Sequence, residues 1–394
     1  MNGQVNMKMA APSTARRTMS PPVPYDRWLL FAVAALIAIG LLMVASASIV
    51  ISDKQLHQPF YFLYRQIVGL VLGVLIGSIV VQFDVILWKK IDIVLLMGVV
   101  VLLALVLLPG IGHTVNGSAR WIGYGPLKIQ VSELAKFAVV IYMASYLVRS
   151  HHDIQASIMG FLKPMALLAV VGLLLLCEPD FGATAVIMTT ALGMMFLAGM
   201  RLQYFIFLFL IVLAAMVIFA ISEPYRVARL TTFLNPWAHP FNSGYQLTQA
   251  LIAFGRGGWL GAGLGESIQK LFYLPEAHTD FLFAVIGEEL GFVGMFVVVS
   301  LFTFLVLRIF LIGRQAQKLE RHFAGFLAYG FGLWLAMQFT VSMGVNLGIL
   351  PTKGLTLPLV SYGGSSMLIN CIVIAVLLRI DYENRMVMLG LKDA

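Results

Sequence analysis

The strongest constraint in the sequence is a series of apolar runs long enough to cross a lipid bilayer. A transmembrane helix needs about 20 predominantly apolar residues, and a backbone inside lipid must satisfy its own hydrogen bonds. The runs predict an all-α integral membrane protein with about ten transmembrane helices, at residues 28–51, 62–83, 91–109, 131–148, 164–178, 183–200, 203–221, 281–307, 323–347 and 359–380. The fifth run is short and ends at the polar break Glu178–Gly182, so runs five and six form either a full or a re-entrant hairpin.

Composition agrees with this fold class, because only 11% of the 394 residues are charged, against about 25% in soluble domains. The flanks of the apolar region are polar. We expect a disordered cytoplasmic tail at residues 1–27, a transmembrane domain at 28–385 and a short cytoplasmic C-terminal tail at 386–394.

The positions of the basic residues set the expected orientation. The formal net charge is +8, but most of the 26 Lys and Arg residues fall in one alternate set of short loops and in the tails. By the positive-inside rule that set is cytoplasmic, so both termini are predicted to be cytoplasmic. Since the charge follows membrane topology, it does not indicate a nucleic-acid partner.

One connection is far longer than the others. Residues 222–280, between the seventh and eighth predicted helices, form a large extracytoplasmic loop that is too long for a plain connector. Ser243 is placed to cap a short amphipathic helix at 244–254. The glycine-rich stretch 255–265 that follows has no preceding strand, so we interpret it as a tight turn close to lipid or protein rather than a nucleotide loop.

Ionisable side chains in or beside the predicted helices need a partner, a wet cavity or a position near the interface. Glu133 and Lys136 share one face of the fourth helix, which fits an ion pair or a cationic lining for an anionic headgroup. Arg120, in the outer loop before that helix, is typical of an interfacial anchor or of a phosphate ligand. Glu288 and Glu289, inside the eighth helix, predict an aqueous or paired interior.

The most informative carboxylate is Asp280, at the junction of the long loop and the eighth helix. It belongs to the segment Pro275–Phe281, whose other polar side chains are Glu276, His278 and Thr279. An aspartate at the start of a helix is typical of an N-cap. At the edge of a membrane cavity the pKa of a carboxylate rises, which suits a general base. Both roles stay open from the residues alone.

A second polar segment, Pro351–Ser366, leads into the tenth helix. Its small residues, Ser361 among them, allow close helix packing, and Lys353 adds another cation. The outer side thus gathers three cations and one acid: Arg120, Lys136, Lys353 and Asp280. This set suits a lipid-borne anion such as a pyrophosphate, with base catalysis beside it.

These residues lie in motifs that resemble the SEDS family (shape, elongation, division and sporulation proteins). The resemblance covers Trp28 to Arg385 and is most specific at Gly244–Gly258, Gln269–Phe281, Gly287–Gly291 and Val345–Ser366. Within the family, the sequence is most similar to the division member. In that family's pattern, Asp280 matches the essential outer-loop aspartate.

The resemblance implies a peptidoglycan glycosyltransferase of the bacterial cytoplasmic (inner) membrane, acting at the division septum. Its substrate would be lipid II, a disaccharide-pentapeptide on undecaprenyl pyrophosphate, which it would polymerise into β-1,4-linked strands. Its partners would be a class B penicillin-binding protein of the FtsI type and other divisome membrane proteins.

With Asp280 as catalytic base, we expect substrate contacts from the polar residues of the outer side: Arg120, Glu133, Lys136, Glu276, His278, Thr279, Lys353 and Ser361. No ligand cluster in the sequence requires a metal, which leaves a divalent cation, Mg or Mn, as an open cofactor.

Two other function classes fit part of the pattern. Buried charges among ten helices are also typical of a transporter, here a lipid II flippase, although such carriers place their key charges near the midplane. A scaffold that recruits division proteins would need only the cytoplasmic tail and the apolar helix faces.

Overall fold

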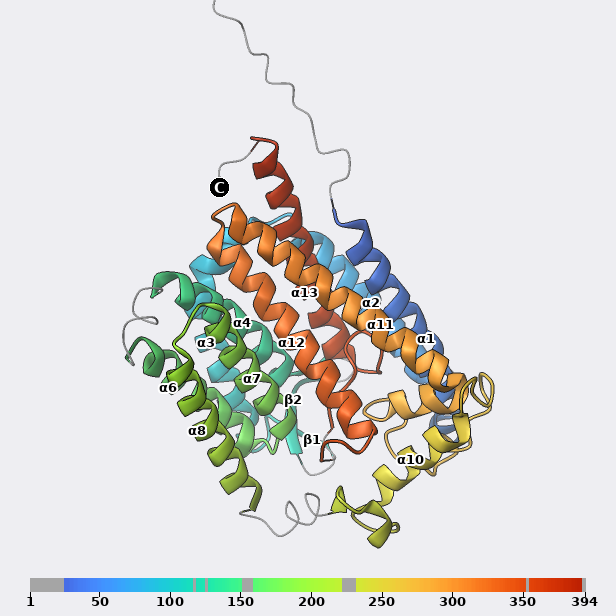
Figure 1. Ribbon diagram of the computed structural model, residues 1–394. Helices are drawn as coiled ribbons and strands as arrows, with labels where there is room; N and C mark the ends of the chain where they lie inside the picture. The colour runs from blue at the N-terminus through green and yellow to red at the C-terminus, as the bar shows by residue number, and fades with distance from the viewer. Residues whose placement is uncertain are drawn as a thin grey trace, which may run out of the picture.

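The computed structural model describes residues 25–115, 118–124, 127–150, 159–221, 232–351 and 354–391. The predicted N-terminal tail up to residue 24, Lys353 and the end of the predicted C-terminal tail lie outside these residues. Most of the described chain is helical, and the long helices lie side by side (Figure 1).

Each predicted apolar run overlaps one long helix. The long helices are α1 (Arg27–Leu56), α2 (Tyr61–Val80), α3 (Val85–Val106), α4 (Val131–Arg149), α6 (Met159–Cys177), α7 (Phe181–Leu197), α8 (Leu202–Ile221), α11 (Leu282–Lys318), α12 (His322–Asn346) and α13 (Gly364–Met388). Of these, α1, α2, α4, α11, α12 and α13 are long and apolar enough to cross a membrane. The chain is therefore a multi-pass membrane protein.

Helix α4 lies at the centre of the bundle, where it contacts α3, α7 and α12. Its residues from Val131 to Leu147 are buried almost without interruption. Consequently Glu133 and Lys136 lie inside the protein and not at its lipid-facing surface.

Between α3 and α4 the chain forms a small antiparallel sheet that the all-α prediction missed. Its strands are β1 (His113–Val115), β2 (Ser118–Tyr124) and β3 (Leu127–Gln130), in the order β1-β2-β3. The fold class is thus corrected to mostly helical with one sheet. Such short strands carry too little alternation to distinguish them from a polar connector.

The long loop contains the expected amphipathic helix, α10 (Tyr245–Gly257). The predicted cap is wrong, because the N-cap is Gly244 and no side chain caps the helix. The Ser243 hydroxyl instead shares a hydrogen bond of 2.8 Å with the Thr232 hydroxyl. A cap needs its oxygen over the first turn, and this contact turns Ser243 toward the preceding segment.

The glycine-rich turn after α10 packs on a break in α11, which confirms that it lies close to protein. Gly291 has φ 65° and ψ −164°, so the helical hydrogen-bond pattern is interrupted there. The turn supplies the missing partners: Phe292 N donates to Gly258 O at 2.9 Å, and Ala262 N donates to Glu288 O at 2.9 Å. The loop is therefore joined to α11 backbone to backbone.

A row of glycines joins α2 to α13. A Cβ at Gly73 would lie 2.9 Å from the Cβ and Sγ atoms of Cys371, and one at Gly77 would lie 3.4 Å from the Cβ atom of Ala375. Small residues four apart on one helix face allow this close approach in membranes.

We therefore expect Gly73→Leu to destabilise the protein, because the new side chain must push α2 away from α13. The cost of such overpacking is about 1–3 kcal/mol. The matched control is Gly98→Leu on α3, where nothing lies within 4 Å of an added Cβ. Thermal unfolding in detergent measures both, and equal midpoints for the two variants would contradict this packing.

Candidate active site

Asp280 lies in the turn that enters α11, and its carboxylate faces the segment that begins at Gly354. A Cβ added at Gly354 would lie 2.5 Å from Asp280 Oδ2, so a larger residue there would displace the carboxylate. The N-cap of α11 is Phe281, with no side-chain hydrogen bond. The Asp280 carboxylate therefore does not cap the helix, so it remains able to accept a proton.

The backbone around Asp280 is held from two sides. Asn346, fully buried at the end of α12, donates from Nδ2 to the Asp280 carbonyl at 2.9 Å and accepts from Ala284 N at 3.2 Å. Tyr362 N donates to the His278 carbonyl at 3.0 Å. The turn is thus tied to α12 and to the segment before α13, which fixes the backbone that carries the carboxylate.

The surroundings of Asp280 tune its protonation. Burial, together with the negative charges of Glu276 and Asp180 and against the lowering effect of the Arg120 guanidinium, raises the pKa of Asp280 to about 7. Both protonation states are then populated near neutral pH, which is the condition that suits a general base.

The other predicted residues of this turn lie beside Asp280. Glu276 accepts a hydrogen bond of 2.7 Å from the Thr279 hydroxyl, which closes the turn on itself. The His278 ring is buried, with centroids 4.5 Å from Phe62 and 5.6 Å from Tyr362. Burial lowers the pKa of His278, so its imidazole is neutral at pH 7.

Arg120 extends from β2 to the turn between α6 and α7. It donates from Nε to the Glu178 carbonyl at 3.2 Å and from Nη2 to the Pro179 carbonyl at 2.7 Å. Nη1 has no partner within the part of the chain that the structure describes. The guanidinium therefore anchors one turn and keeps a donor for an anion near Asp280.

Two further acids of this site, Glu178 and Asp180, were not predicted from the sequence. Glu178 is 1% exposed, and neither of its carboxylate oxygens has a hydrogen-bond partner among the described residues. Burial and the negative charge of Asp180, against the lowering effect of Arg120, raise the pKa of Glu178 to about 8. Asp180 caps α7 by accepting from Ala183 N at 3.2 Å. The polar break at Glu178–Gly182 was the available signal.

Lys136 and Glu133 lie one layer deeper. Their ion pair is 2.8 Å long, and Lys136 also donates to Gln338 Oε1 at 2.7 Å. Gln338 in turn donates to the Thr356 carbonyl at 3.0 Å. Thus the buried ammonium reaches the segment after Gly354 through one glutamine.

Ser361 also serves the framework. Its hydroxyl accepts from Leu357 N at 3.1 Å, and its carbonyl accepts from Gln66 Nε2 at 3.1 Å. The structure therefore brings Asp280, Glu276, Thr279, His278 and Arg120 together, with Glu133, Lys136 and Ser361 supporting them from behind.

The open question of a divalent cation finds no support in the donor set. Within the described ranges, no group of three or more His, Cys, Asp or Glu side chains is placed to hold a metal. We therefore derive no step through a metal ion.

The protonation of Glu178 predicts how stability changes with pH. Its pKa is about 8 in the folded chain against an ordinary 4.5, so the folded state holds the proton more tightly. This contribution is complete below pH 4.5 and is lost as pH rises toward 8. At about 1.4 kcal/mol per pKa unit, the loss is on the order of a few kcal/mol.

We therefore expect Glu178→Gln to melt at a higher temperature than the natural protein at about pH 8 and to show a flatter pH dependence. Thermal unfolding in detergent between about pH 5 and pH 8.5 measures this. The matched control is Glu320→Gln, which changes an exposed carboxylate. A Glu178→Gln curve parallel to that of the natural protein would show that the acid is charged in the folded state.

Comparison with known proteins assigns the family. The model of a family described as "Cell cycle protein", FtsW/RodA/SpoVE, matches residues 27–386. A probable peptidoglycan glycosyltransferase FtsW of Legionella pneumophila is 60% identical over 95% of this chain and 96% of its own length. A protein of the same name from Coxiella burnetii is 53% identical, over 91% and 96%.

Solved structures agree with the sequence matches. A chain from a study of polymerization and crosslinking by a peptidoglycan synthase complex superposes with a TM-score of 0.75 and 29% identity, over 91% of this chain and 98% of that one. The rod shape determining protein RodA of Thermus thermophilus gives a TM-score of 0.67 and 28% identity, over 92% and 97%. The chain therefore belongs to the FtsW/RodA/SpoVE family of cell cycle proteins, the SEDS family that its motifs resemble.

Proposed function

We propose that the protein is a peptidoglycan glycosyltransferase that polymerises lipid II into β-1,4-linked glycan strands during septal wall synthesis. The observation that supports this most is the Asp280 carboxylate, which is held by its backbone, kept from capping and brought to a pKa of about 7. The names of the relatives that share nearly the whole chain agree with it.

The proposed reaction needs a base and a site for a departing anion. Asp280 accepts the proton from the 4-hydroxyl of the acceptor N-acetylglucosamine, and that oxygen attacks C1 of the donor N-acetylmuramic acid. The bond to pyrophosphate breaks with inversion, through an oxocarbenium-like transition state. Undecaprenyl pyrophosphate leaves with the bonding electron pair, and the free Nη1 of Arg120 stabilises its charge.

The remaining predicted residues take supporting roles in this proposal. Lys136 is fully engaged by Glu133, Gln338 and the Trp334 ring 5.2 Å away, so it positions the segment after Gly354. His278 and Thr279 shape the turn that carries Asp280. Lys353 is a further candidate for the pyrophosphate, although it falls outside the described residues.

Topology follows the same proposal. All ten long helices cross the cytoplasmic (inner) membrane, with both termini cytoplasmic. The loop at 222–280 is then extracytoplasmic, and Asp280 faces the side where peptidoglycan is assembled. Helix α3 fits this assignment because Asp92, near its start, pairs with Arg149 at 2.8 Å, and the helix from Ile93 to Val106 is apolar.

The partner we propose is a class B penicillin-binding protein of the FtsI type, with other divisome membrane proteins around it. The support is the structural neighbour that was studied as part of a complex for polymerization and crosslinking. A transpeptidase beside the polymerase would use each new strand as it emerges.

The flippase alternative was favoured by buried carboxylates that could carry a charge across the membrane, and these carboxylates are paired. The buried carboxylates of Glu133, Glu288 and Glu289 are each paired with a cation, at 2.8, 2.7 and 2.7 Å. Paired charges of this kind hold helices together and are not free to carry an ion or a headgroup.

We expect Asp280→Asn to lower lipid II polymerisation by about 10²–10⁴-fold in the purified complex, since an amide cannot accept the proton. The matched control is Asp53→Asn, which changes an exposed aspartate at the end of α1. Gel analysis of glycan strands gives the rate, and thermal unfolding verifies the fold. Near-normal polymer from Asp280→Asn would remove Asp280 from the mechanism.

A proteoliposome experiment separates the enzyme from the carrier. With lipid II supplied only on the outer face, we expect glycan strands to form, because Asp280 faces that side in the proposed topology. Translocation of the headgroup without any polymer would favour the flippase.

A further inference from the structure

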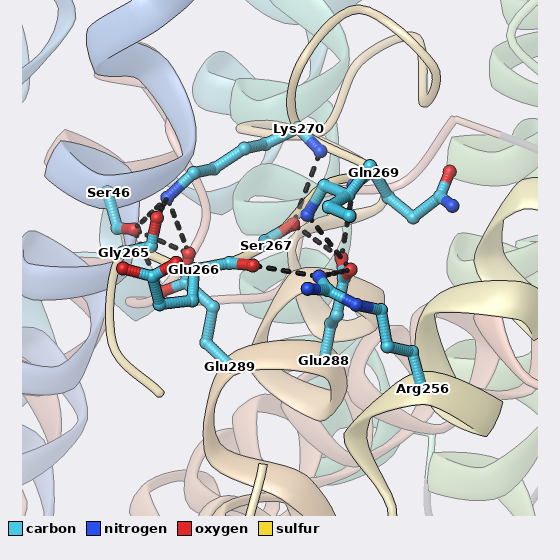
Figure 2. Close-up of polar contacts among 10 residues, drawn as sticks. Ser46, Arg256, Gly265, Glu266, Ser267, Gln269, Lys270, Glu288 and Glu289 are labelled. Carbon is cyan, nitrogen blue, oxygen red and sulfur yellow. Dashed lines mark hydrogen bonds and ion pairs between the residues drawn. The ribbon is translucent and has the colours of Figure 1, made fainter. Parts of the chain in front are cut away.

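The two acids deeper in α11 close a polar network that Asp280 does not use (Figure 2). Glu288 and Glu289 are at most 1% exposed. Arg256 Nη1 lies 2.7 Å from Glu288 Oε1, and Lys270 Nζ lies 2.7 Å from Glu289 Oε1. Lys270 also donates to Ser46 Oγ of α1 at 2.9 Å and to the Gly265 carbonyl at 2.7 Å. The three ammonium hydrogens of Lys270 are therefore fully used.

Beside this network, a cavity of about 550 Å³ lies between α1 and the loop segment 264–271. Its walls are largely apolar and come from both sides: Leu42, Ile49, Val50, Phe60, Leu264 and Ile268. At about 1.5 Å per residue, the 30 residues of α1 exceed the roughly 30 Å hydrocarbon core. The α1 residues that line the cavity, Leu42 to Val50, lie in the half of the helix that runs from the hydrocarbon core to one headgroup layer. The cavity therefore suits a hydrocarbon chain.

At the polar end of the cavity, several hydrogen-bond donors have no acceptor among the described residues. Arg256 uses Nη1 for Glu288 and for the Glu266 carbonyl at 2.8 Å, while its Nε and Nη2 atoms have no partner among the described residues. The same holds for the backbone N–H groups of Leu264, Gly265 and Ser267, three residues that line the cavity. A guanidinium fork and adjacent free N–H groups form a typical phosphate site.

The polar end also carries a carboxylate without a cation. The Glu266 side chain is exposed, lines the cavity and has no partner in the described part of the chain. With Glu288 and Glu289 already opposite Arg256 and Lys270, carboxylates outnumber cations here. A strongly anionic pyrophosphate is therefore disfavoured, whereas a headgroup with one phosphate and one ammonium matches both signs.

We propose that this cavity binds a zwitterionic phospholipid of the phosphatidylethanolamine class. An acyl chain lies along the Leu42–Val50 face of α1. The phosphate accepts from Arg256 and from the free N–H groups of the 264–267 turn, and the ammonium group faces Glu266. The lipid then joins α1 to the loop that leads to Asp280. This site is independent of the proposed glycosyltransferase reaction.

The test is native mass spectrometry of the full chain purified in detergent, with phosphatidylethanolamine, phosphatidylglycerol or inorganic phosphate added. We expect one retained phosphatidylethanolamine, about tenfold weaker retention of phosphatidylglycerol and none of inorganic phosphate. Arg256→Lys keeps the charge opposite Glu288 but removes the spare donors, so it should weaken retention of both lipids about tenfold. Glu266→Gln should abolish the preference for phosphatidylethanolamine.

Steric variants test the location. Ala45→Phe places a ring in the cavity and should prevent retention of the lipid. Val71→Phe, on an exposed apolar face of α2, is the matched control and should retain it. Equal retention of the two phospholipids by the natural protein, or unchanged retention in Ala45→Phe, would overturn the proposal. Because the readout is lipid binding, loss of this site and loss of polymerase activity are separate results.

Discussion

A charge buried inside a membrane protein is costly unless another charge or a set of hydrogen bonds compensates it. In this chain that requirement joins segments that are far apart in the sequence. Lys136 of α4 holds the segment after Gly354 through Gln338, and Glu288 and Glu289 of α11 hold the long loop through Arg256 and Lys270. At the opposite end of the bundle, Arg321 pairs with Glu383 of α13. The pairs made by Lys136, Glu288 and Glu289 thus hold the segments that lead to Asp280 and follow Gly354.

Asp280 and Glu178 depart from this rule. Glu178 is buried and Asp280 is half-buried, neither has a direct cationic partner among the described residues, and desolvation raises the pKa of Asp280 to about 7 and that of Glu178 to about 8. The framework holds Asp280 by its backbone, through Asn346, and leaves its carboxylate to titrate. A site that pairs the deep acids Glu133, Glu288 and Glu289 with cations, and leaves Asp280 near an Arg120 Nη1 that has no partner among the described residues, is organised for proton transfer next to an anion.

The helices and the Glu133–Lys136 pair could be predicted from the sequence because both leave local signals. Apolar runs of bilayer length mark the helices, and the i, i+3 spacing of Glu133 and Lys136 predicts their pair. The roles of Glu178, Asn346 and Gln338 could not be predicted, since each depends on contacts across long sequence separations. The sheet that carries Arg120 was missed for a related reason, because its short strands are defined by pairing with each other. Likewise, the local sequence predicts Ser243 as a helix cap, but in the structure its hydroxyl shares a hydrogen bond with the Thr232 hydroxyl instead.

The central claim is that Asp280 acts in its ionised form in a site that sets its pKa, and the pH dependence of single-turnover lipid II polymerisation tests it most directly. The rate should rise with pH and level off, with a midpoint near the pKa of about 7. In Glu276→Gln the midpoint should move to lower pH, because the nearby negative charge that raises this pKa is gone. A rate that is flat across this range, or a midpoint that Glu276→Gln leaves in place, would contradict the account.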